Sequence, residues 1–389
     1  MGLNSITDFW DRKEHDIDDP LRETWSTKNI DEEIAHEKDT QGQPSHAEYR
    51  HTKPYQDYAC RVVGPALEGL HKNFVAGWNA FAPAAQKVKL VTPRPAKIPT
   101  LWENPAHEVQ IVRTQPKEHD KSIKQLYYQS TSYARNYIYI ENQYFFYPAF
   151  AQHLKAERKK FCDAWARLSN KPMQEIPTLH MFIVIPHPES DGMVPRTHAL
   201  LAELGEGQTM QAQEDWGKKK KDKPQPDPLH RPSKQDLEKT LGLKVSVARL
   251  RTCGPDANNR MAYREIYIHS KLMLIDDVFV TLGSANINQR SMAVDSEINI
   301  AATGQLWAAD LRKRVFEMHS GGDVSGSGDR DKMPMNFDKW NGRMDDNLEL
   351  MLAGKLMEGF ILPFDDHRAT GKMYAQVTVP SAGISTMDA

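Results

Sequence analysis

The pattern of hydrophobic and polar positions divides this chain into alternating strands and helices. Short apolar runs, typical of buried strands, lie at 58–65, 137–141, 179–185, 243–250 and 298–302. Apolar residues at helical spacing predict helices at 66–81, 123–134, 150–168, 197–204, 305–318 and 347–360. Because strands alternate with helices, we expect an α/β sandwich with a mixed central sheet flanked by helices.

One predicted hairpin, at 267–282, carries polar side chains within its apolar pattern. Tyr267, His269 and Lys271 are two residues apart, so on a strand they point to the same side. Asp276 and Asp277 occupy the predicted turn. The apolar partners that pair across this hairpin are Leu272, Leu274, Val278, Val280 and Leu282.

The polar residues of the hairpin suit the cleavage of a phosphodiester. His269, Lys271 and Asp276 form an H-x-K-x4-D pattern, and the segment 283–286 reads G-S-A-N. An imidazole can attack phosphorus or protonate a leaving oxygen. An ammonium and an amide can stabilise the negative charge that builds on the phosphate oxygens. A carboxylate such as Glu297 can fix the tautomer and orientation of an imidazole.

This pattern resembles the HKD motif of the phospholipase D superfamily, followed by that family's G-S-x-N segment and its glutamate. The residues that match in order are His269, Lys271, Asp276, Ser284, Asn286 and Glu297. The resemblance implies that the histidine exchanges the proton and that Lys271 and Asn286 hold phosphate oxygens. Ser284 would support that contact. Asp276 and Glu297 would be structural or orienting carboxylates.

Two further stretches are similar to the same family. The stretch 137–145 resembles the segment that opens the second half of members with two motifs, which implies substrate binding by Glu141, Asn142, Gln143 and Tyr144. The stretch 55–66 resembles the end of the first half. We therefore expect residues 1–115 to be a remnant of a first phospholipase D lobe plus a linker, and residues 116–389 to be the second lobe.

The resemblance lacks the first HKD motif of the family. His36 and His119 each begin an H-x-K triplet, but Gln43 and Leu126 stand where the motif has aspartate. The family's active site joins two motifs, and the upstream histidine is usually the nucleophile. This implies that His269 is the general acid and that a missing first lobe completes the site. Alternatively, a second copy of the chain does so, with one His269 attacking and the other acting as the acid.

The overall likeness is greatest to bacterial phospholipase D proteins of the eukaryotic-like type, some of which are type VI secretion lipase effectors. The function this implies is hydrolysis of glycerophospholipids to phosphatidic acid and a headgroup alcohol, through a phosphohistidine and without a cofactor. One alternative is a catalytically incomplete half that acts as a lipid-binding or partner-completing subunit. Another alternative is a nuclease of the same superfamily.

Composition narrows the set of partners. A formal net charge of −2 and a pI near 6.7 do not favour nucleic acid, so we expect a phospholipid at a membrane surface. The sequence shows no metal-ligand cluster, and Cys60, Cys162 and Cys253 suit reduced thiols. We find neither an apolar run of about 18 residues nor a signal peptide, which leaves the location open. A type VI effector would be cytoplasmic in its producer and delivered to target cells.

Overall fold

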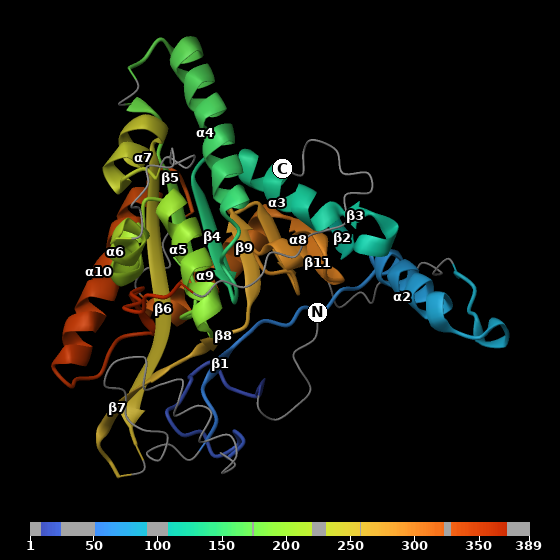
Figure 1. Cartoon of the computed structure of the whole chain (residues 1–389), viewed down its shortest axis with the longest axis horizontal. Helices are drawn as coiled ribbons and strands as arrows, with labels where there is room; N and C mark the ends of the chain where they lie inside the picture. The colour runs from blue at the N-terminus through green and yellow to red at the C-terminus, as the bar shows by residue number, and fades with distance from the viewer. Residues whose placement is uncertain are drawn as a thin grey trace.

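A mixed β-sheet forms the centre of the molecule (Figure 1). The computed structural model describes residues 9–24, 51–91, 108–172, 175–219, 231–256, 258–322 and 328–371. Within these residues the strand order is β12-β6-β5-β4-β9-β10-β11-β2-β3, and β7 pairs with β6. The strands are β2 (Glu108–Gln115), β3 (Asp120–Lys121), β4 (Tyr137–Asn142), β5 (Leu179–Val184), β6 (Leu243–Pro255), β7 (Met261–Glu265), β9 (Lys271–Ile275), β10 (Phe279–Gly283), β11 (Glu297–Thr303) and β12 (Ile361–Pro363).

Strand direction determines which side chains meet at one edge of this sheet. The strands β4, β5 and β6 are parallel, whereas β9, β10, β11 and β2 continue the sheet in antiparallel pairs. The carboxyl ends of β4 and β5 therefore lie beside the start of β9, where Asn142 pairs with Lys271. Ligands of open α/β sheets commonly bind at the carboxyl ends of parallel strands.

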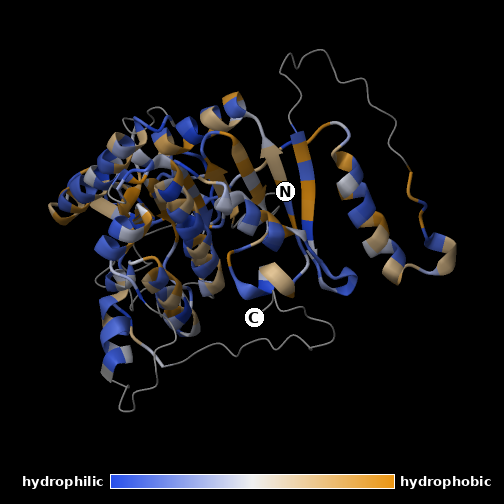
Figure 2. Cartoon of the chain, turned by 90° about the horizontal axis from the view of Figure 1, so that it is seen from above, coloured by the Kyte–Doolittle hydropathy of each residue, from blue (hydrophilic) through white to orange (hydrophobic). Residues whose placement is uncertain are grey.

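Helices cover both faces of the sheet, as the sequence predicted. Phe150, Leu201 and Leu237 come from helices on one face, and Phe316 and Trp340 from helices on the other. The first face carries α3 (Ser122–Ser132), α4 (Pro148–Ser169), α5 (Val194–Glu203) and α7 (Lys234–Leu241), and the second carries α9 (Gln305–Ser320) and α10 (Met333–Leu352). Figure 2 shows the apolar residues gathered on the central strands. The shorter helices are η3 (Ala84–Gln86), η4 (Pro116–Glu118), η6 (Asp191–Met193), η7 (Gly207–Met210), α6 (Gln211–Lys219) and α8 (Gln289–Ala293).

The predicted hairpin is confirmed by β9 and β10. Asp276 and Asp277 have φ of 53° and 56°, and the N–H of Val278 donates to the carbonyl of Ile275 at 3.0 Å. Two central residues with positive φ are the signature of a type I′ turn, whose twist matches the flanking strands. The turn therefore fixes the register that brings Lys271 to the beginning of β9.

The segment before α2 differs from its prediction. The expected strand at 58–65 is wrong, because the strand there is β1 (Tyr55–Gln56), which pairs in parallel with β8 (Tyr267–Ile268). The ladder continues only as far as His269, whose N–H donates to the carbonyl of Gln56 at 2.9 Å. Beyond it no strand of the described residues pairs with this segment. Instead, Tyr58, Cys60 and Val62 turn inward against the core beneath α9 and α10.

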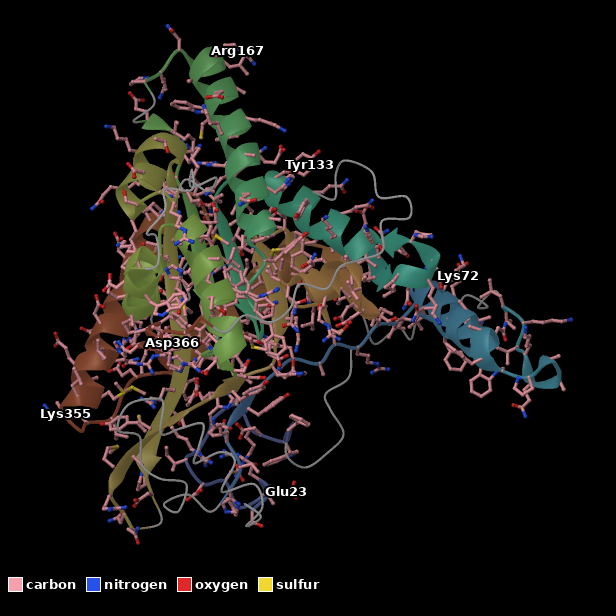
Figure 3. The ribbon with its side chains drawn as sticks, in the orientation of Figure 1. Glu23, Lys72, Tyr133, Arg167, Lys355 and Asp366 are labelled. Carbon is pink, nitrogen blue, oxygen red and sulfur yellow. The ribbon has the colours of Figure 1, made fainter. Side chains whose placement is uncertain are left out.

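The helix α2 (Leu67–Phe81) forms as predicted and extends away from the body (Figure 1). Gly69 gives it close access to β2, since a Cβ there would lie 2.8 Å from the side chain of Ile111. Figure 3 shows Lys72, on this helix, at the side of the molecule opposite Lys355. Phe74 is 58% exposed and Phe81 is 80% exposed, so α2 presents aromatic side chains to solvent.

One expected helix falls elsewhere, and a hairpin lies at the expected domain division. Strand β2 ends at Gln115 and pairs with β3 just beyond it. The expected helix at 347–360 is α10, which begins at Met333 and ends at Leu352. The carboxamide of Asn347 bonds the backbone of Glu358 and Ile361 and so shapes a loop there.

Two other histidines, His36 and His119, begin an H-x-K triplet in the sequence. His36 lies outside the described residues, and His119 occupies a left-handed turn after η4 with φ of 54°.

Across the described part of the chain, no helix combines the length and the apolar character needed to cross a bilayer.

Candidate active site

The imidazole of His269 is held by a carboxylate from a distant part of the chain. His269 lies between β8 and β9, and its Nδ1 is 2.8 Å from Oδ2 of Asp57, directly after β1. Because Nδ1 is occupied, Nε2 is the nitrogen available for chemistry. The histidine side chain is 26% exposed, so it is held and still accessible. Our sequence reasoning gave Asp57 no role, because a separation of 212 residues leaves no local signal.

Lys271 places a buried ammonium beside this pair. Its Nζ donates to Oε1 of Gln143 at 2.8 Å and to the carbonyl of His269, and the residue is 4% exposed. Burial lowers the pKa of Lys271 to about 8, although the nearby carboxylates of Asp57, Glu297 and Glu189 act in the opposite direction. This ammonium therefore stays mostly charged at neutral pH but loses its proton at a lower pH than an exposed lysine, and a bound anion would favour its charged form.

The G-S-A-N loop packs tightly against β11. A Cβ on Gly283 would lie 2.0 Å from the side chain of Asn299, so this position requires glycine. Asn299 accepts the N–H of Ala285 at 3.2 Å, and the hydroxyl of Ser284 accepts the N–H of Ile298 at 3.0 Å. The carboxamide oxygen of Asn286 accepts the N–H of Tyr144 at 3.1 Å, which orients its amide.

Glu297 begins β11 at the same edge. Burial raises the pKa of its carboxyl group, while hydrogen bonds from Ser284 and Ser291 act in the opposite direction. The hydroxyl of Ser291 donates to its Oε1 at 2.6 Å. The field of Glu297 also reaches Lys271. The structure thus brings His269, Lys271, Ser284 and Glu297 to one edge of the sheet.

Glu141, expected to bind substrate, is completely buried and satisfied by the protein. Its carboxylate accepts hydrogen bonds from Tyr58 at 2.6 Å, Tyr139 at 2.6 Å, Ser270 at 2.6 Å and His319 at 2.8 Å. Burial alone would raise the pKa of Glu141, but the imidazole of His319 and these donors lower it. Its placement favours a structural role that joins the segment at 58 to the motif strand.

The other three expected binding residues differ in their placement. Asn142 is also fully buried, and its Oδ1 accepts the N–H of Ile287 at 2.9 Å. Its Nδ2 has no acceptor among the described residues. Gln143 contacts Lys271, and Tyr144 lies partly exposed just beyond the end of β4. Gln143 and Tyr144 are therefore the two of this set best placed to meet a ligand.

Asp276 lies at the far end of β9. Its carboxylate accepts the backbone N–H groups of Arg135 at 2.7 Å, Asn136 at 2.9 Å and Tyr137 at 2.7 Å. Five residues of strand separate it from Lys271, which corresponds to roughly 16 Å at ~3.3 Å per residue. Asp276 therefore anchors the start of β4 and does not contact the reacting groups.

Our sequence reasoning also missed Glu189. It follows β5, and its carboxylate accepts the hydroxyl of Tyr144 at 2.8 Å, the hydroxyl of Tyr267, and the amide of Gln143 at 3.5 Å. The ring of Tyr267 stacks on Tyr55 with centroids 5.4 Å apart. The position of Glu189, just after a predicted parallel strand, was the available signal.

Comparison with known proteins finds similarity over part of this chain. Residues 245–325 match the family model for phospholipase D. Human phospholipase D1 is 29% identical over 257 residues, covering 61% of this chain and 23% of that protein. Phospholipase D delta of Arabidopsis thaliana is 33% identical over 204 residues, covering 47% of this chain and 21% of that protein. The chain therefore spans less than a quarter of the length of these two relatives.

Two solved structures align with part of this chain. Nuc from Salmonella typhimurium, a phospholipase D family member, is 14% identical with a TM-score of 0.31, covering 54% of this chain and 91% of that one. NucT from Helicobacter pylori is 13% identical with a TM-score of 0.30, covering 55% of this chain and 96% of that one.

Proposed function

We propose that this chain takes part in the hydrolysis of glycerophospholipids to phosphatidic acid and a headgroup alcohol, since residues 245–325 match the family model for phospholipase D. The observation that carries the proposal is the pair of Asp57 and His269, 2.8 Å apart and next to the buried ammonium of Lys271. This pair and this ammonium supply a proton donor and a charge stabiliser for one phosphate.

In the proposed mechanism, a histidine from a second motif attacks phosphorus and forms a P–N bond. The P–O bond to the headgroup breaks, and Nε2–H of His269 protonates the departing oxygen. Lys271 and Asn286 hold the non-bridging oxygens, and Ser284 supports the loop. Water then attacks the phosphohistidine and gives its proton to His269, which releases phosphatidic acid and restores both histidines. Asp57 fixes the tautomer of His269 in both steps.

The second histidine would come from a first lobe or from a second copy of this chain. Two observations support a first lobe. The exposed aromatic residues of α2, including Phe74 and Phe81, offer an apolar face next to β2, the strand that pairs with the one carrying Glu297. Glu297 is a carboxylate at the site edge that could orient an incoming imidazole as Asp57 orients His269.

A reconstitution experiment tests the proposal. The purified chain, with its mass measured by light scattering, is assayed on phosphatidylcholine vesicles alone and with a polypeptide carrying an upstream H-x-K-x4-D lobe. We expect little activity from a monomer, because in-line displacement needs the nucleophile and the acid on opposite faces of phosphorus.

Each outcome of this experiment has a distinct meaning. Restored phosphatidic acid release that His269→Asn abolishes would support the first-lobe form. Activity that follows a dimer peak would support two copies. Full activity from a monomer would refute the requirement for a second histidine. A stable complex that lacks activity on every phosphodiester would support the non-enzymatic subunit instead.

A further inference from the structure

Glu189 is a carboxylate beside the catalytic groups that phosphate chemistry does not require. Lys271 experiences the fields of three carboxylates, those of Asp57, Glu297 and Glu189. Asp57 orients the imidazole of His269, and the proposed role of Glu297 is to orient the imidazole of the second histidine. A third negative charge at this place opposes the binding of an anion unless the ligand also carries a positive charge.

Aromatic rings connect Glu189 to the reactive histidine. The hydroxyls of Tyr144 and Tyr267 both donate to its carboxylate, and Tyr267 lies two residues before His269. Tyr55 stacks on Tyr267 at 5.4 Å and lies 5.4 Å from the ring of His269. Carboxylates paired with tyrosine rings are a common surrounding for ammonium groups, which are attracted to both the charge and the ring faces.

The loop that carries Glu189 is fixed in place. Arg368 donates to the carbonyl of Pro188 at 2.7 Å, and the charge of Arg368 is balanced by Asp366 at 2.7 Å. On the other side, Gln143 joins the two halves of the site, since it accepts from Lys271 and donates toward Glu189. The carboxylate is thus held at a set position relative to the phosphate-binding ammonium.

We propose that Glu189, with Tyr144 and Tyr267, recognises the ammonium of an amino-alcohol headgroup such as choline or ethanolamine. This inference rests on the proposed function. If His269 protonates the leaving oxygen, the headgroup must lie on the side of that histidine, where Tyr267 leads to Glu189. Lys271 then binds the phosphate and Glu189 binds the ammonium, so each charge of a zwitterionic lipid lies next to the opposite charge on the protein.

The test uses two soluble phosphodiesters that differ only in their headgroup, glycerophosphocholine and glycerophosphoglycerol. Binding to the full chain is measured by NMR titration. We expect glycerophosphocholine to bind about tenfold more tightly, and Glu189→Gln to remove this difference by weakening glycerophosphocholine without weakening glycerophosphoglycerol, whose negative charge the carboxylate opposes. Tyr144 and Tyr267 donate to different oxygens of Glu189, so the glutamine oxygen can still accept from one of them. Glu157→Gln, an identical charge change on the outer part of α4, should leave both affinities unchanged.

Three results would count against the inference in different ways. Equal binding of the two diesters by the wild type would overturn headgroup recognition and leave the phosphate site intact. A preference for choline that survives in Glu189→Gln would assign the recognition to other residues. Binding of neither diester would contradict the proposed function itself, and the inference would fail with it.

Discussion

Replacing Lys271 by methionine should stabilise the free protein while removing its activity. The side chain keeps similar length and loses its charge. A buried ammonium pays a desolvation cost, which is why the pKa of Lys271 falls from 10.5 to about 8. At ~1.4 kcal/mol per pKa unit, this shift corresponds to about 3–4 kcal/mol of destabilisation at neutral pH.

The substitution also has a cost, which reduces the gain. Lys271 donates to Gln143 and to the carbonyl of His269, and the loss of a donor to a buried acceptor costs about 1–3 kcal/mol. We therefore expect Lys271→Met to raise the free energy of unfolding at pH 7 by about 1–2 kcal/mol. Turnover should fall by about 10²-fold or more, because the ammonium stabilises charge that grows in the transition state.

The pH dependence of stability provides an independent check that the charge of Lys271 destabilises the folded protein. Below pH 8 both the folded and the unfolded protein hold the lysine proton, so the full penalty is present. Between about pH 8 and 10.5 the unfolded chain holds the proton and the folded protein does not, so the contribution of Lys271 to stability rises with pH. In Lys271→Met this rise should be absent.

Urea unfolding of both proteins at pH 7 and pH 9.5, together with turnover of a soluble phosphodiester by the completed enzyme, measures these quantities. A variant that is less stable at pH 7 and keeps its rate per folded molecule would refute the reasoning. It would make Lys271 a structural residue. Lys159→Met, at an exposed lysine paired with Asp163 on α4, is the control and should change neither quantity appreciably.

Further predictions follow from the same contacts. His269→Ala should lower turnover about 10²–10⁴-fold with an unchanged circular dichroism spectrum, and an unchanged rate would contradict its role in proton transfer. Asp57→Asn should lower turnover about 10²-fold or more while the urea midpoint stays close to that of the wild type. Tyr58→Phe should lower the free energy of unfolding by about 1–3 kcal/mol, measured with urea, since it removes a donor to the buried Glu141. EDTA should leave turnover of a soluble phosphodiester unchanged, because His269 and Lys271 supply the proton and the charge; loss restored by a divalent ion would contradict this.

Local patterns predicted the fold and the motif side of the site. The hairpin from Lys271 to Gly283 follows from alternation and from two aspartates that tolerate positive φ, both of which are properties of neighbouring residues. The strand predicted at 137–141 and most helices follow for the same reason. His269 and Lys271 were identified because, with Asp276, they form an H-x-K-x4-D pattern that resembles the HKD motif.

Contacts between distant segments could not be predicted. Asp57 and Glu189 come from two loops whose local sequence does not indicate that they face the motif strand. Substrate binding by Glu141 was implied by the resemblance of the stretch 137–145 to the family. Its burial depends on the segment at Tyr58, the loop at Ser270 and α9 packing around it, which a single strand cannot reveal.

The distance along the chain between Asp57 and His269 affects when the site can exist. A ribosome that adds about 5–20 residues per second needs roughly 10–40 s to travel the 212 residues between them. During that interval β1 has no strand to pair with, and Glu141, which accepts from Tyr58, has no hydrogen bond from Ser270. A growing chain therefore carries no oriented histidine until its hairpin has emerged. Premature release or a stalled ribosome would yield a polypeptide without the Asp57–His269 pair.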